Sequence, residues 1–599
     1  MGAPPSVSIT NAFAFGTPNF LNRAALPDER RWQVADTLNW ARGRHNFKFG
    51  GDYVHTDDRI NNLFSGFGVY SYSTLPAYFT DLTFSQSAAT ASKAKNYSSY
   101  VQGFGIPGVE FQTGDFGFFA EDNWKVNKQL TLTIGLRYEY EKLPAPFSSL
   151  VVATLPQTGV LPSNKTNIGP RVGFAYDVFG SGKTILRGGY GMFFARILNG
   201  TVYNALINTG SPNGQFTVSP TATAPTAPAF PQIIASGSLA GAPNSVFFDS
   251  NFRAPLINQA DLTVEQDLGW NTVMSVTWLG TFGRRLPNFT DLNMNPPTTV
   301  TYNVIDTTGK GPLPNGSTFT SKFYGKNTTP NCSSQRPNCA FGSLTDIFSG
   351  VNSSYQGLVA QLNHRFSNHL QFNANYTWSH ALDFGQNNQT ASVANNLLDP
   401  QNIASEYGNS ITNIPNRLVM TAVVTAPWKY TGWKAYLLND YEVSPSLQLQ
   451  SGLPYSIGTS GTLTTGFTAS GSTLSAIGQG ANGSGYASGP GTTSRLPGFE
   501  RNGFQQPKTV VTDLRLSKRF SVKERVKLEF LGEAFNVANH QNVTGVNMTA
   551  YTVGSATATK TNTLTYTTAV PTFGATTATN TSGFSYAPRQ IQLGVRAQF

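Results

Sequence analysis

The segment Gly180–Thr184 (Gly-Ser-Gly-Lys-Thr) contains the residue types of a phosphate-binding loop, in which backbone amides, a lysine and a hydroxyl hold a phosphate group. The first glycine of such a loop is replaced by Asp177, and a strand pattern follows where a helix should begin. Gly188–Gly191 likewise lacks the spacing of a dinucleotide-binding motif. We therefore predict a hairpin turn at Gly180–Gly182 and no cofactor.

Histidine is a common general base and metal ligand. The histidines of this chain show no His-Glu-x-x-His arrangement and no cysteine partner at metal-binding spacing; they are His45, His55, His364, His369, His380 and His540. A hydrolase could still assemble Asp, His and Ser from different strands, which sequence spacing does not reveal. We predict no catalytic and no metal site, and we keep the enzyme as an alternative.

Cys332 and Cys339 are the two cysteines of the chain, and they lie in a stretch rich in Asn, Ser and Pro. An oxidising exterior favours a disulfide between them. Closing so short a loop contributes about 2–3 kcal/mol in the chain-entropy model. Two free thiols or a metal site are the alternatives to this predicted disulfide.

The composition excludes several classes of protein. Charged residues are 12% of the 599 residues, and aromatic residues are also 12%. Soluble proteins carry about twice that charged fraction, and a chain so rich in aromatic residues is not expected to be disordered. No stretch approaches the roughly 18–20 apolar residues of a spanning helix, so the sequence excludes a helical membrane protein.

The formal net charge is +10, but lysine and arginine are spread singly along the chain. This distribution argues against nucleic-acid binding and favours contact with anionic lipid head groups or sugars. Met1–Ser6 lacks the basic cluster and apolar core of a secretory signal. We therefore expect the start to be truncated or internal.

The carboxyl-terminal residues alternate between apolar and polar side chains. Ile591, Leu593, Val595, Ala597 and Phe599 share one face of a strand, and Gln590, Gln592, Gly594, Arg596 and Gln598 share the other. One face suits lipid and the other suits water. A strand that ends on an aromatic residue is typical of an outer-membrane barrel, so we predict a barrel-insertion signal formed by Gln592, Gly594, Ala597 and Phe599.

The same period of two residues recurs in hairpins along the chain. In the clearest one, Phe116–Trp124 leads through Asn127-Lys128 into Leu130–Tyr140, which alternates over the length that a tilted membrane strand needs. The other predicted hairpins join 32–40 to 47–53, 172–176 to 186–194, 262–268 to 274–278, 358–366 to 370–378, 418–424 to 433–443 and 514–520 to 526–530, before the closing strand 589–599. About 15 strands result, and residues 6–16 are a candidate for one more.

Short and long connections alternate between these strands. Turns of about two to six residues are followed by loops of roughly 25 to 70 residues, such as 57–114, 195–257, 282–353 and 537–588. Outer-membrane barrels have short periplasmic turns and long external loops. We therefore predict an all-β fold, an antiparallel transmembrane β-barrel of about 15 to 16 strands with long extracellular loops and short periplasmic turns.

The predicted faces carry different residues. Trp32 and Trp40 lie eight residues apart on the lipid face, or roughly 20 Å along the membrane normal, and suit two aromatic girdles. Asp36 and Asp122 are exceptions on that face. The inner face mixes both signs of charge, which a wet lumen or a plug contact explains; these residues are Arg137, Glu139, Arg171, Arg187, Glu265, Asp513, Arg515, Arg525, Glu529, Glu533 and Arg596.

A series of different segments lies along the chain in a recognisable order: Arg42–Asp52, Phe119–Val126, Gly169–Asp177, Leu186–Gly191, Tyr376–His380, Gln450–Tyr455, Glu533–Asn536 and Pro588–Gly594. Together they resemble the Oar-like TonB-dependent receptors over nearly the whole chain. The resemblance implies a 22-stranded plan with an N-terminal plug, a TonB box and often a regulatory-like domain. We recognise none of these parts and expect residues 1–30 to be an N-terminal remnant and residues 31–599 to be the barrel.

The resemblance also implies partners and a function. The expected partners are outer-membrane lipid and lipopolysaccharide, the barrel-assembly machinery through the carboxyl-terminal strand, and TonB only through a missing N-terminal region. The expected function is binding and uptake of a large nutrient at the bacterial outer membrane, without energised transport by this portion alone. A passive pore or a structural surface protein is the alternative. Ligand identity is not specified by these residues.

Overall fold

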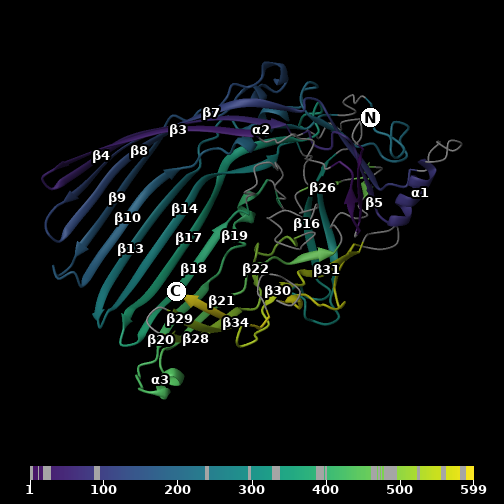
Figure 1. Cartoon of the computed structure of the whole chain (residues 1–599). Helices are drawn as coiled ribbons and strands as arrows, with labels where there is room; N and C mark the ends of the chain where they lie inside the picture. The colour runs from purple at the N-terminus through teal and green to yellow at the C-terminus, as the bar shows by residue number, and fades with distance from the viewer. Residues whose placement is uncertain are drawn as a thin grey trace.

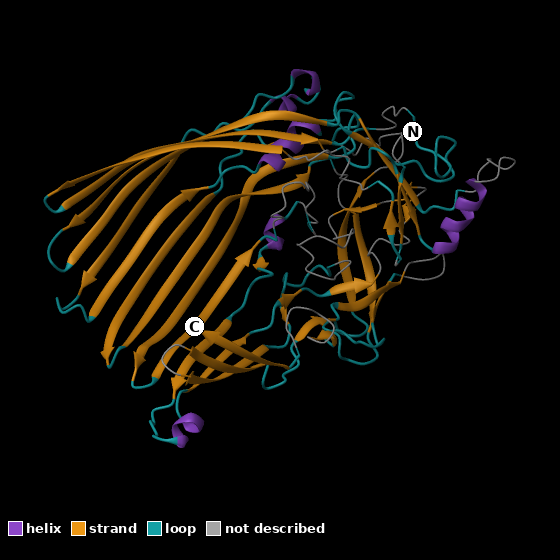
Figure 2. Cartoon of the chain, viewed as in Figure 1, coloured by secondary structure: helices purple, strands orange, loops and turns teal. Residues whose placement is uncertain are grey.

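The computed structural model describes residues 4–10, 12–17, 28–61, 63–85, 95–235, 242–293, 298–326, 337–385, 397, 399, 401–460, 468–469, 472–473, 475–477, 495–522, 526–554, 562–579 and 588–598. One large curved sheet dominates it, and smaller sheets gather at the end of the sheet where the long connections lie (Figure 1, Figure 2). The described α-helices are α1 Leu75–Ser85, α2 Asn199–Ile207 and α3 Trp433–Leu438. None of the helices in this described part is long and apolar enough to cross a membrane.

The large sheet is antiparallel, and its main strands pair in chain order. This confirms the predicted all-β, antiparallel class. Its strands are β3 Asp28–Arg42, β4 His45–Asn61, β7 Gly108–Lys125, β8 Leu130–Lys142, β9 Asn167–Asp177, β10 Thr184–Phe194, β13 Leu256–Gly269, β14 Thr272–Asp291, β17 Leu344–Ser367, β18 Leu370–Asp383, β20 Asn416–Thr425, β21 Tyr441–Gln450, β28 Thr509–Val522, β29 Val526–Phe535 and β34 Gln590–Gln598.

The outer face of this sheet exposes apolar side chains that a soluble protein would bury. Trp32 is 67% exposed, Ile134 52% and Val595 64%. Because side chains alternate along a strand, these residues share one face, while their polar neighbours occupy the other. A face of this kind requires hydrocarbon as its solvent.

Aromatic side chains form two rows on the outer face. Near the short turns, the rings of Trp40 and Phe47 lie 5.4 Å apart, and those of His45 and Trp124 also 5.4 Å. Nearer the long connections, Phe116 lies 4.7 Å from Tyr53 and 6.1 Å from Tyr140. The two rows agree with the predicted girdles.

The two acidic residues predicted on the outer face have different surroundings. Asp122 lies at the short-turn end, where its Oδ2 is 2.7 Å from Nδ1 of His45. Asp36 is exposed on β3, and its Oδ1 accepts a hydrogen bond from the backbone N–H of Thr37 at 2.8 Å. A polar partner next to each carboxylate reduces the cost of its place on this face.

One predicted strand is wrong. The sequence pattern predicts a hairpin strand over residues 433–443, but Trp433–Leu438 is the helix α3 and β21 begins at Tyr441. Trp433, Tyr436 and Leu437 have the spacing of a helix, and Trp428 donates its indole N–H to the Leu438 carbonyl at 2.6 Å. The connection between β20 and β21 is therefore longer than the predicted short turns.

Two long connections are shorter than predicted, because the strands continue past the apolar band. The predicted loops 57–114 and 282–353 become 62–107 and 292–343. In β4 the added residues, from Asp57 to Asn61, are polar except for Ile60, so apolar alternation could not reveal them. Between β14 and β17 the register shifts near Leu286 and Pro287, which breaks the period that the prediction used.

The amino-terminal residues do not join the large sheet. Residues 6–16, the candidate for one more barrel strand, contain β1 Ser6–Ile9 and β2 Ala14–Phe15. These strands belong to a small sheet of order β11-β6-β5-β1-β2, with β5 Val69–Tyr72, β6 Ser99–Phe104 and β11 Phe216–Val218. Its core contains Val7, Ile9 and a group of buried tyrosines, and burial of these side chains stabilises the small sheet.

A second small sheet lies among the long connections. Its order is β23-β31-β32-β15-β16-β26, with β15 Thr298–Ile305, β16 Thr318–Lys326, β23 Gly458–Ser460, β26 Ser475–Ile477, β31 Thr549–Gly554 and β32 Thr563–Tyr566.

The remaining short strands are β12 Ser245–Phe248, β19 Gly408–Asn409, β22 Pro454–Tyr455, β24 Thr468–Ala469, β25 Ser472–Thr473, β27 Phe504–Gln505, β30 Val543–Val546 and β33 Thr576–Thr579.

The first and last strands of the large sheet are its edges. β3 pairs with β4, and β34 pairs with β29. No pairing joins β3 to β34 among the described residues, and most residues of both strands are exposed. The outer edges of these two strands therefore carry backbone groups available for pairing.

A charge on the lipid face should cost more than the same charge on the inner face. Met420 is 41% exposed near the middle of β20, and the next residue, Thr421, pairs with Asn373 and Ser446 on the inner face. We expect Met420→Arg to lower the free energy of unfolding in lipid vesicles by about 2–4 kcal/mol. Thr421→Arg, the control, should change it by about 0.5 kcal/mol. Equal losses in a urea titration would contradict the assignment of faces.

The buried tyrosines should make the amino-terminal small sheet sensitive to high pH. Burial raises the pKa of Tyr97 and of Tyr100 to about 12 each. A tyrosine in the unfolded chain has a pKa near 10. The neutral phenols therefore stabilise the folded sheet fully below about pH 10, and this stabilisation is lost as the pH rises towards 12. Absorbance at about 295 nm should show that Tyr97 and Tyr100 ionise at a higher pH than exposed tyrosines do. Ionisation at the same pH as exposed Tyr436 would contradict this prediction.

Candidate functional site

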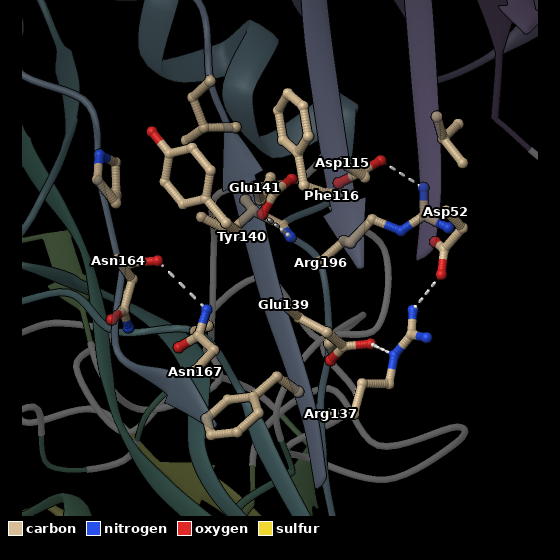
Figure 3. Close-up of a pocket in the computed structure, with 17 residues that line it drawn as sticks. Asp52, Asp115, Phe116, Arg137, Glu139, Tyr140, Glu141, Asn164, Asn167 and Arg196 are labelled. Carbon is tan, nitrogen blue, oxygen red and sulfur yellow. Dashed lines mark hydrogen bonds and ion pairs between the residues drawn. The ribbon is translucent and has the colours of Figure 1, made fainter. Parts of the chain in front are cut away.

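The inner face of the large sheet contains a polar cavity of about 300 Å³ near the long connections. β4, β7 and β8 form its wall, and residues 162–167 and 194–197 close it from the side (Figure 3). The cavity therefore lies where the strands of the sheet meet two of the long connections.

An arginine joins two carboxylates along one wall of the cavity. Arg137 Nη2 lies 2.8 Å from Asp52 Oδ1, and its Nε lies 2.7 Å from Glu139 Oε1. The guanidinium crosses over Gly117, where an added Cβ would lie 2.6 Å from Asp52 Oδ1 and closer still to Arg137. A side chain at position 117 would displace this ion pair, because the pair occupies the space that a Cβ would enter.

A second pair ties a long connection to the wall. Arg196, which follows β10, places Nη1 2.6 Å from Asp115 Oδ2. The next residue, Ile197, donates its backbone N–H to Glu141 Oε2 at 3.0 Å. Asp115 and Glu141 are cross-strand partners of β7 and β8, so two neighbouring carboxylates hold one segment of the connection.

Several polar atoms of the cavity have no hydrogen-bond partner within the described structure. They are Asp115 Oδ1, Asn164 Nδ2 and Asn167 Oδ1, and all are shielded from solvent. A buried polar atom without a partner is costly, so such atoms point to a bound polar molecule or ordered water. The four carboxylates outnumber the two guanidinium groups, so the cavity suits a ligand that donates hydrogen bonds.

The sequence identified part of this site. The strand parity predicts Arg137 and Glu139 on the inner face, and both line the cavity. Asp52, Asp115, Glu141 and Arg196 were missed. Asp52 alternates with the apolar residues of the predicted strand 47–53, so the same parity argument could have found it, whereas nothing in the spacing brings Arg196 to Asp115.

The other predicted inner-face charges that the structure describes lie outside the cavity. Arg187 is 3.7 Å from Glu265, Arg515 3.9 Å from Glu533, and Arg596 3.9 Å from Glu529. Arg171 lies over the Phe193 ring at 4.4 Å, and Asp513 accepts a hydrogen bond from the Asn536 N–H at 2.8 Å. Arg525 lies outside the described residues. The inner face therefore carries paired charges from β8 to β34.

The predicted insertion signal lies on β34. Gln592, Gly594 and Ala597 pair with Glu533, Leu531 and Leu528 of β29. Phe599 lies outside the described residues, so its part in the signal stays a prediction.

Cys339 is disulfide-bonded, whereas Cys332 lies outside the described residues. The predicted pairing of the two cysteines therefore stays a prediction.

The segment that resembled a phosphate-binding loop is a hairpin turn, as predicted. β9 ends at Asp177 and β10 begins at Thr184. Asp177 Oδ2 accepts the N–H of Gly182 at 2.8 Å, which closes the turn. Among the described residues, no group of three or more His, Cys, Asp or Glu side chains could hold a metal ion.

Gly117→Ala should uncouple Arg137 from Asp52. The added methyl group displaces the guanidinium from Asp52. We therefore expect Asp52→Asn to lower the free energy of unfolding by about 1 kcal/mol when Gly117 is present. In the Gly117→Ala background the same substitution should change it by almost nothing. Gly173→Ala, where the nearest atom to the new Cβ is 3.5 Å away, is the control and should preserve the effect. If Asp52→Asn lowered the free energy of unfolding equally in both backgrounds, the Arg137–Asp52 ion pair would not depend on the space above Gly117.

The chain is similar to several solved structures at low identity. The outer membrane transporter YddB from Escherichia coli is similar over 95% of this chain and 54% of its own, at 10% identity and a TM-score of 0.47. The FrpB iron transporter from Neisseria meningitidis (F5-1 variant) is similar over 95% and 55%, at 10% identity and 0.43. P. aeruginosa FpvA, bound to a heterologous pyoverdine, is similar over 95% and 48%, at 10% identity and 0.41. The chain thus spans about half the length of these proteins.

No curated protein matches the chain. The family model described as an outer membrane beta barrel domain matches residues 1–592. Together with the apolar outer face and the charged inner face, this match shows that the chain belongs to the outer membrane β-barrel domain family and is located in the bacterial outer membrane.

Proposed function

We propose that the chain is the barrel portion of an Oar-like TonB-dependent receptor, which binds a large nutrient and takes part in its uptake. The observation that carries the proposal is the cavity at the long connections, with its partnerless polar atoms on Asp115, Asn164 and Asn167. Long connections that reach over a polar inner wall are suited to capturing a solute from outside. The cavity would hold one polar part of that nutrient.

The edges of the sheet support the proposal that further strands complete the barrel. β3 runs towards the short turn at 43–44, and β34, which follows the long connection 536–589, also runs towards the end with the short turns. Because both strands point the same way, direct pairing of β3 with β34 would be parallel. An odd number of strands between them would keep every pairing antiparallel. The 22-stranded plan satisfies this condition. In lipid each unpaired backbone group costs several kcal/mol, which favours completion.

Energised transport would then need more than this sheet. In the proposed receptor, a plug fills the barrel and a separate segment contacts TonB. The paired charges of the inner face, such as Arg515 with Glu533, would face that plug. This portion of the receptor would therefore bind the nutrient without driving its passage.

A passive pore is the second candidate. Paired charges of both signs extend along the inner face beyond the cavity, and such a wall also suits a water-filled channel. Planar-bilayer recordings of the chain alone distinguish the two functions. We expect no stable, uniform channel, because the edges of β3 and β34 are unpaired. Long-lived openings of one uniform conductance would favour the pore.

The cavity can be tested separately. Native mass spectrometry of the protein purified from outer membranes should detect a bound small molecule. The double variant Asp115→Asn/Arg196→Gln should lose it, because both polar contacts at the cavity change. Arg515→Gln/Glu533→Gln changes a charge pair elsewhere on the inner face and should retain it. Loss in both variants, or no bound molecule in the wild type, would contradict binding at the cavity.

A further inference from the structure

Two buried arginines lie where two long connections meet the end of β18. Arg495 and Arg501 belong to the connection between β21 and β28. Glu406 ends the short helix η3 (Ile403–Glu406) in the connection between β18 and β20. That connection also contains β19, which pairs with β18 at the long-connection end of the sheet (Figure 1). This junction is separate from the cavity at Arg137, because none of its residues lines that cavity.

Both guanidinium groups contact Glu406. Arg495 Nη2 donates a hydrogen bond to Oε2 of the Glu406 carboxylate, and Arg501 Nε donates one to the Glu406 backbone carbonyl at 2.8 Å. Arg501 Nη2 also donates to the carbonyl and carboxylate of Asp383 and, at 3.2 Å, to the Gly408 carbonyl. The two arginines therefore tie the two connections to each other and to the end of β18.

The enclosed part of this junction carries an excess of positive charge. The side chains of Arg495, Arg501 and Glu406 are 1%, 0% and 0% exposed. Asp383 lies at the rim, where 23% of its side chain is exposed. Burial lowers the pKa of Arg495; Glu406 opposes this shift, and Arg501 adds to it. Among the described groups that they contact, two enclosed guanidinium groups thus share one enclosed carboxylate.

Several N–H groups of the two arginines lack an acceptor. Nε and Nη1 of Arg495 and Nη1 of Arg501 are shielded from solvent and have no hydrogen-bond partner within the described structure. A buried donor without an acceptor is costly, and a buried charge without compensation is more costly still. A water molecule would supply an oxygen atom but no charge. An oxyanion supplies several oxygen atoms together with the negative charge.

We propose that Arg495 and Arg501 hold a small oxyanion, such as phosphate, sulfate or a carboxylate, at the junction of the β18–β20 and β21–β28 connections. The oxyanion accepts the remaining N–H groups and balances the second guanidinium. Because the site is enclosed, the anion is a resident ligand that fixes the two connections to each other, and not a solute that passes along the inner face. This inference goes beyond the proposed function and does not depend on it.

The first test measures anion binding by the full chain, purified in detergent and exchanged into chloride buffer. Radiolabelled phosphate should bind the wild type in equilibrium dialysis, and sulfate should displace it more readily than chloride does. Ion chromatography of the unfolded protein identifies any anion that is retained through purification. A retained oxyanion supports the proposal in the same way as bound label.

Matched variants locate the bound anion. Arg495→Gln/Glu406→Gln removes a guanidinium and its carboxylate together, and should weaken phosphate binding about tenfold. Arg187→Gln/Glu265→Gln removes a more exposed pair from the inner face and should change the affinity less than about twofold. Far-UV circular dichroism verifies that both variants keep the β-sheet.

Hydrogen exchange tests the same site in the wild type and needs no variant. Phosphate should slow amide exchange about tenfold in residues 403–409 and leave β5 of the amino-terminal small sheet unchanged. Unchanged exchange in residues 403–409 would overturn the proposal, as would the absence of any bound or retained oxyanion. So would a folded Arg495→Gln/Glu406→Gln variant with wild-type affinity, or an equal loss of binding in Arg187→Gln/Glu265→Gln.

Discussion

The structure depends on one constraint: successive side chains of each strand meet different solvents, while the backbone groups between strands satisfy one another. In hydrocarbon an unpaired N–H or C=O is costly, so the strands must form a continuous ladder. The ladder then fixes which side chains face lipid and which face water. Ile134 and its neighbour Thr133 are adjacent in sequence but lie on opposite faces, and the same separation of faces continues to Val595 and Arg596 on the last strand.

On the inner face this constraint concentrates polar groups that compensate one another. Arg137 pairs with one carboxylate on β4 and one on its own strand, β8, and its guanidinium lies in the space that a side chain at Gly117 would enter. Asp115 and Glu141 then hold the segment at Arg196, so the wall and the connection are fixed together. Burial leaves other polar atoms without partners at this junction. A polar site arises there because wall and connection supply more hydrogen-bonding groups than they satisfy.

On the outer face the apolar surface ends at a definite level. Aromatic rings of Tyr53, Phe116 and Tyr140 form a row near that level, and charged residues of β3, β4 and β7 follow on the same parity beyond it. The strands continue because their backbone hydrogen bonds do not depend on the solvent of the side chains. This explains why apolar alternation located the membrane part of β4 and β7 but placed their ends too early.

The sequence by itself determined the all-β class, the two faces of the long strands and the hairpin turn after Asp177, because all three follow from local periodicity and turn chemistry. It also placed Arg137 and Glu139 on the inner face. It did not determine that residues 433–438 form a helix or that residues 6–16 join a separate sheet, because short apolar runs fit more than one structure. Only the tertiary structure brought Arg196 to Asp115, 81 residues away in sequence, since that contact depends on strand register and on the path of a long connection.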